Sequence, residues 1–326
     1  MSEALLRVDG VRVDIPTRRG LLRAVDGVNL MLAPGRTLGI VGESGSGKTM
    51  LARAILQLLP RHARLAGQVM FEGQDLAGLP TAALRRLRGP AIAVVFQDPM
   101  SSLNPVLTIG TQIAETLRAH RRITHAAAAE RAATLLAEVG IPAPGQRLAQ
   151  YPHQLSGGMR QRVAIAIALS CEPRLLIADK PTTALDVTVQ AQILGLLTRE
   201  QQRRHMAMIL ITHDLGIVAG RTDEVAVMYA GRIVERAPTR ALFAATRMPY
   251  TAALFAALPK PDAPPHTRLP VIEGRPPDPT QHTSGCGFAP RCAYSDAACR
   301  RARPPLAGGS HAFACFHPLG TNAGTT

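Results

Sequence analysis

The chain is poor in aromatic residues, in lysine and in long apolar runs. It has no tryptophan, seven phenylalanines and four tyrosines, so aromatic residues make up only 3% of its 326 residues. Proteins that bind single-stranded nucleic acids interleave aromatic rings with cations, because bases stack on the rings. No stretch of the sequence has that pattern, and we expect no nucleic-acid partner. No apolar run approaches the roughly 20 residues that a membrane-spanning helix needs, so we expect no transmembrane segment.

Basic residues outnumber acidic ones by 37 to 23, which gives a net charge of +14. Only three of the cations are lysines, Lys48, Lys180 and Lys260, and the arginines are spread along the chain. This diffuse charge is typical of a solvated surface, although it would also favour an anionic cytoplasmic leaflet. Residues 1–7 lack a basic region followed by an apolar core, so we expect no signal peptide and a cytoplasmic protein.

Residues 42–49 fit the pattern G-x-x-x-x-G-K-[ST] of a phosphate-binding P-loop at every fixed position. They are Gly42, Glu43, Ser44, Gly45, Ser46, Gly47, Lys48 and Thr49. The apolar run at 38–41 indicates a strand, and the helical spacing of apolar residues up to Pro60 indicates a helix. Backbone N–H groups at a helix N-terminus attract phosphate; Lys48 adds a positive charge and Thr49 a hydroxyl for magnesium. The alternative, a glycine-rich turn, is disfavoured by this flanking strand and helix.

The order of the remaining elements predicts an α/β fold. Residues 5–35 indicate short strands with a polar break at 17–20, and residues 109–154 indicate helices. Short buried strands at 92–96, 175–178, 208–212 and 225–228 alternate with helices, which predicts a mainly parallel sheet covered on both faces. The composition shifts near Pro259. We therefore expect a main domain at 1–258, with a helical part at about 99–165, and a Cys-rich, Pro-rich extension at 259–326.

Asp179 directly follows the buried strand at 175–178. In a chain with a P-loop, a carboxylate at the carboxyl end of such a strand is typical of a Walker B aspartate, which holds magnesium through water. An aspartate that caps the following turn is the alternative interpretation.

Four of the five cysteines lie within 30 residues of the extension. Their spacing, C-x5-C-x6-C-x15-C, is neither the short zinc pattern nor a common ferredoxin pattern, and a reducing cytosol disfavours disulfides. Four thiolates suit an iron–sulfur cluster or zinc, with free thiols as a third possibility, and His311 and His317 could replace a cysteine ligand of zinc. Cys171 is expected to be a buried structural thiol, and His153 a packing histidine. The four are Cys286, Cys292, Cys299 and Cys315.

Residues 155–162, Leu-Ser-Gly-Gly-Met-Arg-Gln-Arg, resemble the signature of ABC-type ATPases. With the P-loop, Gln97, Asp179, residues 184–186 and His213, they complete the motif set of that family, in order, across about residues 5–245. Residues 96–105, 151–154 and 249–251, together with the cysteine-rich tail, resemble the ATPase subunits of dipeptide and oligopeptide importers, particularly the dipeptide-permease type. Nickel and glutathione importers share this pattern, so the substrate stays open.

The resemblance implies an ABC nucleotide-binding domain with a mainly parallel sheet core, an N-terminal antiparallel β part, a helical insert that carries the signature, and a small extension. In the family two cassettes face head to tail, so that Ser156, Gly157 and Gly158 of one contact nucleotide in the P-loop of the other. Implied partners are two transmembrane permease subunits, a paralogous ATPase or a second copy of this chain, and a periplasmic or extracellular peptide-binding protein. The chain would then be a peripheral protein on the cytoplasmic face of the membrane.

The resemblance also implies residue roles. Lys48 and the loop amides would hold the β- and γ-phosphates of ATP, while Thr49, Gln97 and Asp179 would organise Mg²⁺. His213 would sense the γ-phosphate and Asp186 would link the two sites. Members of this importer family carry a 4Fe–4S cluster in the tail, which ranks iron–sulfur before zinc for the four cysteines.

Two positions depart from the family pattern. Lys180 follows the Walker B aspartate, where the family has a glutamate that polarises the attacking water, and a cation cannot take that role. Ile15 stands about where an aromatic ring would stack on adenine. Lys180 motivates a rival function, a regulatory subunit that does not hydrolyse ATP. A soluble ABC ATPase that acts on nucleic acid or ribosomes is a second rival, disfavoured because a compact insert, and not a long coiled coil, separates Lys48 from Ser156.

Overall fold

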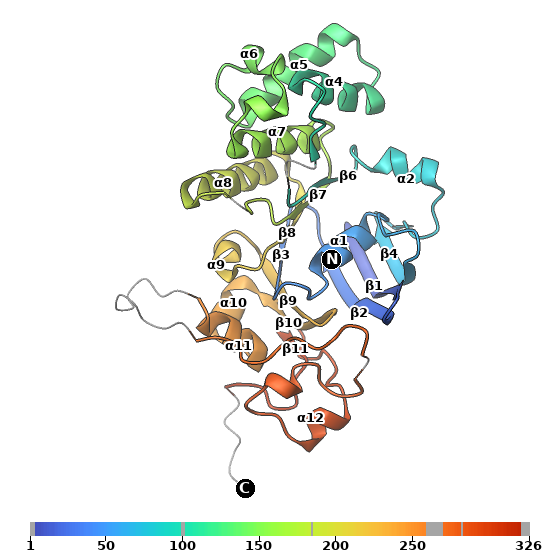
Figure 1. Ribbon diagram of the computed structural model, residues 1–326, viewed down its shortest axis with the longest axis vertical. Coiled ribbons are helices and arrows are strands. Elements are labelled where there is room, and N and C mark those ends of the chain that lie inside the picture. The colour runs from blue at the N-terminus through green and yellow to red at the C-terminus, as the bar shows by residue number, and fades with distance from the viewer. Residues whose placement is uncertain (1–3, 99–101, 184, 259–269, 282, 321–326) are drawn as a thin grey trace. The chain divides into compact units, whose positions relative to one another are not determined.

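The computed structural model describes residues 4–98, 102–183, 185–258, 270–281 and 283–320. They form two compact units. The P-loop unit comprises Ala4–Leu32, Thr37–Ala77 and the described residues from Ile211 onward; the signature unit comprises Ala33–Arg36 and the described residues of Gly78–Leu210. The P-loop unit thus joins the blue N-terminal strands of Figure 1 to its orange and red C-terminal segments. The boundary expected near residue 259 lies in 259–269, outside the described residues, and the division there stays a prediction.

An antiparallel sheet begins the P-loop unit. Its strands lie in the order β2-β1-β4-β5. In β1, Leu6, Val8, Val11 and Val13 are buried and alternate with more exposed residues, which gives the sheet one apolar face. The first two strands are longer than the short strands expected, because the break at 17–20 is a tight turn inside one hairpin. The strands are β1 (Leu6–Thr17), β2 (Gly20–Leu32), β4 (Arg64–Phe71) and β5 (Gln74–Asp75).

The P-loop unit also contains the strands β11-β10-β9-β3, in that order, of which β3 and β9 are parallel. Every residue of β3 is buried, as expected for a strand covered on both faces. The strands are β3 (Thr37–Val41), β9 (Glu224–Tyr229), β10 (Arg232–Pro238) and β11 (Ala312–Phe313). The helices are α1 (Lys48–Ile55), α9 (Leu215–Val218), α10 (Thr239–Ala244), α11 (Pro249–Ala256), η2 (Ala289–Arg291) and α12 (Ala297–Arg301).

The C-terminal extension is attached to this unit at several points. The strand β11 pairs with β10, and His311 lies 2.8 Å from the fully buried carboxylate of Glu235. Arg303 lies 2.8 Å from Asp26 on β2, whose side chain is only 7% exposed. Because these partners belong to strands of the main body, the described part of the extension, although almost without regular structure, has fixed positions on it.

In the signature unit, strands lie in the order β8-β7-β6, with β6 and β7 parallel. The expected mainly parallel arrangement with an antiparallel N-terminal part is therefore confirmed. Figure 1 shows α4 to α7 as a green helical group. The elements are α2 (Thr81–Leu87), β6 (Ile92–Val95), α4 (Ile109–His120), α5 (His125–Glu138), α6 (Pro144–Leu148), η1 (Pro152–Gln154), α7 (Gly157–Leu169), β7 (Leu175–Asp179), α8 (Val187–Arg204) and β8 (Ala207–Ile211).

A cluster of charges fixes the end of α5 to the end of α8. Glu138 accepts hydrogen bonds from Arg131 at 2.8 Å, Arg203 at 2.9 Å and Arg204 at 2.8 Å. Glu200 accepts from the same Arg203 and Arg204 at 2.7 and 2.8 Å. Burial alone would raise the pKa of Glu138, but Arg131 and Arg203 outweigh it and lower the pKa below its ordinary value.

None of the helices in the described part of the chain is both long enough and apolar enough to span a membrane.

Candidate functional site

The P-loop connects β3 to α1 in a conformation that only glycine tolerates at two positions. Gly42 has φ 145° and Gly47 has φ 102°. A Cβ atom on Gly42 would collide with the carbonyl oxygen of Met228, and one on Gly47 with that of Ala24. The loop is therefore pressed against the backbone of β9 and β2, and its own backbone can converge on an anion.

Lys48 is the first residue of α1 and its side chain lies inside the loop. The residue is 3% exposed. Its Nζ donates to the carbonyl oxygens of Gly42 at 2.6 Å and Glu43 at 2.7 Å and to Ser46 Oγ at 3.1 Å. A cation enclosed by a loop at a helix N-terminus, followed by the hydroxyl of Thr49, has the chemistry of a polyphosphate and magnesium site.

Glu43, inside the P-loop motif, is held by residues from the far end of the chain. Its backbone N–H donates to Tyr250 Oη on α11 at 2.9 Å, and its carboxylate receives two hydrogen bonds from Arg291, at 2.7 and 2.9 Å. The hydrogen bond to Glu43, together with one to Tyr229, raises the pKa of Arg291 above its ordinary value. Burial likewise raises the pKa of Tyr250, so both groups keep their protons at any physiological pH.

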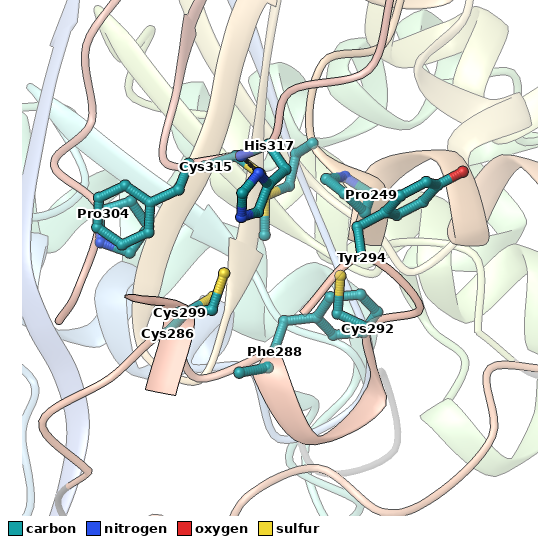
Figure 2. A pocket seen from close by; sticks show the side chains of 12 residues that line it. Pro249, Cys286, Phe288, Cys292, Tyr294, Cys299, Pro304, Cys315 and His317 are labelled. Carbon is teal, nitrogen blue, oxygen red and sulfur yellow. Dashed lines mark hydrogen bonds between the residues drawn. The ribbon is translucent and has the colours of Figure 1, made fainter. Parts of the chain in front are cut away.

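All four tail cysteines line one largely apolar pocket, although they span 30 residues of sequence. Figure 2 shows Cys315 and His317 above the other three cysteines. Burial raises the pKa of the Cys292 and Cys299 thiols, and that of Cys315 to about 11, and the neighbouring sulfurs add to the effect. Such thiols are protonated at neutral pH unless a metal ion replaces the protons.

Among the described residues, one group of possible ligands that includes Cys299 and His317 of this pocket is compact enough for a single ion. The ligand atoms of Asp296, Cys299 and His317 all lie within 4.8 Å of one another. A backbone hydrogen bond from Cys299, and then His317, lowers the pKa of Asp296 to about 2. His311, the other histidine considered for zinc, does not line the pocket, because its ring is bonded to Glu235.

The P-loop unit also carries the predicted positions Ile15 and His213. Ile15 is half-buried on β1 and lies opposite Leu22 of β2. His213 is exposed and lies two residues beyond the end of β8, and the backbone N–H of the intervening Thr212 donates to the carbonyl oxygen of Ile40 of β3 at 3.1 Å. Their contacts with adenine and with the γ-phosphate stay predictions.

Asp179, Lys180 and Gln97 belong to the signature unit. Asp179 is the last residue of β7 and is 2% exposed, as expected of an acid at the carboxyl end of a buried strand. Lys180 adopts a left-handed backbone with φ 48°, which is unusual for a residue with a side chain. Gln97 is exposed just beyond the end of β6.

The signature residues form the start of α7. Ser156 is the N-cap, and its hydroxyl accepts from Met159 N at 3.3 Å; Ser156 and Gly157 are exposed. A Cβ on Gly158 would stand 2.7 Å from Val189 of α8, so the glycine lets the two helices approach. Asp186 caps α8 through a 2.8 Å bond from Val189 N. Ala184, and residues 99–101 of the 96–105 motif, lie outside the described residues.

Sequence reasoning missed Arg291 and Tyr250 as parts of this site. The two residues are separated from Glu43 by 248 and 207 positions. No spacing rule connects such distant residues. The available signals were the charge on Glu43 within the motif and the importer-like pattern at residues 249–251, which gave Tyr250 no role.

A parallel-rich α/β fold with a glycine-rich loop around a buried lysine defines a P-loop nucleotide-binding protein. The family model for the ABC transporter matches residues 25–183, and the model for the oligopeptide/dipeptide transporter C-terminal region matches residues 234–299. More narrowly, the chain belongs to the ABC transporter family. Within that family it is an ATP-binding cassette.

Relatives and solved structures agree with this assignment. A protein of Brucella abortus that carries the name peptide import ATP-binding protein is 50% identical over 92% of this chain and 90% of its own length. One of Brucella melitensis with the same name is 48% identical over 94% of both chains. The ATP-binding cassette MJ0796, dimeric and bound to ADP and Pi, gives a TM-score of 0.64 at 27% identity, covering 72% of this chain and 99% of its own. The cbiO1 protein of Clostridium perfringens gives 0.63 at 27%, covering 74% and 92%.

Proposed function

We propose that this chain is the ATP-hydrolysing subunit of an ABC importer for di- and oligopeptides. The observation that carries the proposal is the P-loop cradle around Lys48, in a chain whose C-terminal region matches the oligopeptide/dipeptide transporter model. The names of the Brucella relatives support the same substrate class. Importers of nickel or glutathione are the alternative within this family.

The test is ATP turnover by the complete transporter in vesicles. Turnover should rise several-fold when a peptide-loaded binding protein is added, and the isolated chain should not respond. Equal turnover with and without the permease subunits would favour a soluble ATPase. Stimulation by a nickel- or glutathione-loaded binding protein, but not by a peptide-loaded one, would move the substrate to that class.

We assign residue roles on the basis of the resemblance and the local geometry. Lys48 and the loop amides hold the β- and γ-phosphates, Thr49, Gln97 and Asp179 organise Mg²⁺, and His213 senses the γ-phosphate. The exposed N-terminus of α7 suits a contact with nucleotide bound by a second cassette, because its free amides attract anions. Ile15 meets adenine without ring stacking, and Asp186 communicates between the two sites.

The same proposal includes the partners. Two transmembrane permease subunits, a second cassette (a paralogue or another copy of this chain) and an external peptide-binding protein complete the transporter. The chain is placed at the cytoplasmic face of the membrane as a peripheral protein, which its diffuse arginine-rich surface supports.

A second proposal concerns Lys180: the site built on this chain's own P-loop binds ATP but hydrolyses it slowly. Loss of a positioned general base typically lowers a rate about 10²- to 10⁴-fold. Lys180→Glu should therefore raise turnover of the assembled transporter, while Lys180→Gln, which removes the charge but supplies no base, should not. Equal turnover of Lys180→Glu and the natural chain, with both sites shown to hydrolyse, contradicts the proposal.

A third proposal places a metal centre in the pocket of the tail cysteines, with iron–sulfur ranked before zinc. All four residues line one apolar pocket, and sulfur ligands suit both metals, which supports such a centre. When bound, the metal would replace thiol protons and cross-link a segment that has little regular structure.

Anaerobically purified protein should be brown and contain iron and sulfide. Cys292→Ser should lose both, and Cys171→Ser, which changes the thiol outside the pocket, should keep them. Colourless protein with stoichiometric zinc would transfer the assignment to zinc, for which Asp296, Cys299 and His317 form the compact ligand group.

A further inference from the structure

Glu43 is a junction between the lysine of the P-loop and the C-terminal extension. Its carbonyl oxygen accepts from Lys48 Nζ at 2.7 Å, its N–H donates to Tyr250 at 2.9 Å, and its carboxylate is bound to Arg291. The N–H, the carbonyl oxygen and the carboxylate of Glu43 thus all take part in hydrogen bonds. A shift of Arg291 would be transmitted over a single residue to the contacts of Lys48.

Arg291 is fixed on all sides. Its guanidinium makes five hydrogen bonds: two to Glu43, one to Tyr229 Oη at 3.2 Å, and two to the carbonyl oxygens of Ile272 and Glu273 at 3.1 and 2.9 Å. Only 4% of the side chain is exposed. Lysine could not reproduce this arrangement, because the planar fork of arginine is what matches a carboxylate with two parallel bonds.

The short helix that carries Arg291 also forms a wall of the cysteine pocket. Ala289 of η2 lines the pocket, as do the residues that flank this helix, Phe288 and Cys292. The ring of Phe288 packs against Tyr229 at 5.4 Å and against Tyr250 at 5.3 Å between centroids. Tyr229, which bonds to Arg291, and Tyr250, which bonds to Glu43, therefore also contact Phe288 of the pocket wall. Because Cys292 is the covalent neighbour of Arg291, a movement of Cys292 also moves Arg291.

We propose that Arg291 is a positioning residue of the nucleotide site, and that through its pair with Glu43 the state of the cysteine pocket and ATP binding at the P-loop are energetically coupled. The inference rests on the proposed function, since it requires that this P-loop bind ATP. Coupling of this kind is reciprocal: metal in the pocket changes the affinity for nucleotide by the same factor by which nucleotide changes the affinity for metal. Typical coupling corresponds to about 5- to 150-fold in affinity.

The experiment measures the Kd for MgATP of the full chain in two states, after removal of metal by chelation and after addition of Zn²⁺ alone. The natural chain should show at least a fivefold difference between the states. Arg291→Lys and Glu43→Gln should each reduce that difference to less than twofold, and the double variant should behave as either single one does. A reverse titration should show MgATP shifting the Kd for Zn²⁺ by the same factor.

A matched control comes from a second bidentate pair in the same unit. Arg236 of β10 binds Glu224 of β9 with bonds of 2.7 and 2.8 Å, and both residues lie outside the P-loop motif at 42–49. Arg236→Lys should keep the full difference between the zinc-loaded and metal-free states. Variants are compared only where circular dichroism shows the natural content of secondary structure, and Glu43→Gln, which preserves shape, serves if Arg291→Lys does not fold.

The results distinguish a failure of the coupling from a failure of the proposed function. No MgATP binding by the natural chain overturns the proposed function, and this inference with it. MgATP binding with the same Kd in both metal states, or a difference that persists in Arg291→Lys and Glu43→Gln, overturns the coupling alone.

Discussion

In the P-loop unit one arginine, Arg291, holds the one carboxylate of Glu43, whereas in the signature unit three arginines share the carboxylates of Glu138 and Glu200. The first pair connects residues 248 positions apart and includes a member of the phosphate loop. The second cluster connects the ends of two helices. Arg291 is 4% exposed, whereas Arg203 of the second cluster is 51% exposed.

The difference is one of redundancy and of solvent. In the shared cluster each carboxylate keeps a partner when one arginine is lost, and water screens the exposed members. In the single pair, removal of Arg291 leaves the carboxylate of Glu43 without its two hydrogen bonds from the guanidinium. All five hydrogen bonds that Arg291 donates are lost. Almost all cations of this protein are arginines. The same arginine–carboxylate chemistry thus forms both the redundant cluster at Glu138 and Glu200 and the single pair of Arg291 with Glu43.

Removing the cation that Glu43 helps to hold gives the largest expected effect. Lys48→Ala should weaken MgATP binding at least 100-fold, or about 2.7 kcal/mol, because a buried ammonium at the phosphate position is lost. Isothermal titration of the full chain measures the change. Arg53→Ala, which removes an exposed cation of the same helix, is the control and should change the Kd less than twofold. Unchanged affinity in Lys48→Ala would refute the P-loop assignment.

Truncating one arginine in each place compares the single pair of Arg291 and Glu43 directly with the shared cluster of Glu138 and Glu200. Arg291→Ala should lower the free energy of unfolding by about 2 kcal/mol, less than the 3–5 kcal/mol typical of a fully buried pair because Glu43 is partly exposed. Arg203→Ala should cost under about 1 kcal/mol. Urea unfolding of both variants at one temperature gives the two values. Equal losses would mean that redundancy does not distinguish the clusters.

Acid should weaken the shared cluster by the smallest amount. The pKa of Glu138 is lowered in the fold, so its contribution to stability is present above the unfolded-state pKa of about 4.3 and is lost as the pH falls through the folded value. The natural chain should therefore lose slightly more stability than Glu138→Gln as the pH falls below the unfolded-state value. Thermal unfolding across that range measures the loss, and parallel curves for the two proteins would contradict the assignment.

The sequence predicted those parts of the molecule in which function constrains neighbouring residues. The P-loop spacing, the buried strand that ends at Asp179 and the helical insert follow from local patterns, because glycine, a terminal carboxylate and helical periodicity each have a local cause. The pairing of Glu43 with Arg291 has no local cause, since it arises only when the extension folds against the phosphate loop within the same unit. The left-handed backbone of Lys180 was likewise missed, because no motif encodes it.

The scarcity of aromatic residues has an optical consequence. Without tryptophan, the near-ultraviolet emission of the chain comes from its four tyrosines. Tyr151 and Tyr294 are 39% and 56% exposed, whereas Tyr229 and Tyr250 are buried with ring centroids 4.5 Å apart and hydrogen-bonded to Arg291 and Glu43. Two of the four fluorescent rings of the protein, Tyr229 and Tyr250, therefore lie where the phosphate loop meets the extension. Tyrosine fluorescence can follow changes at this place without an added label.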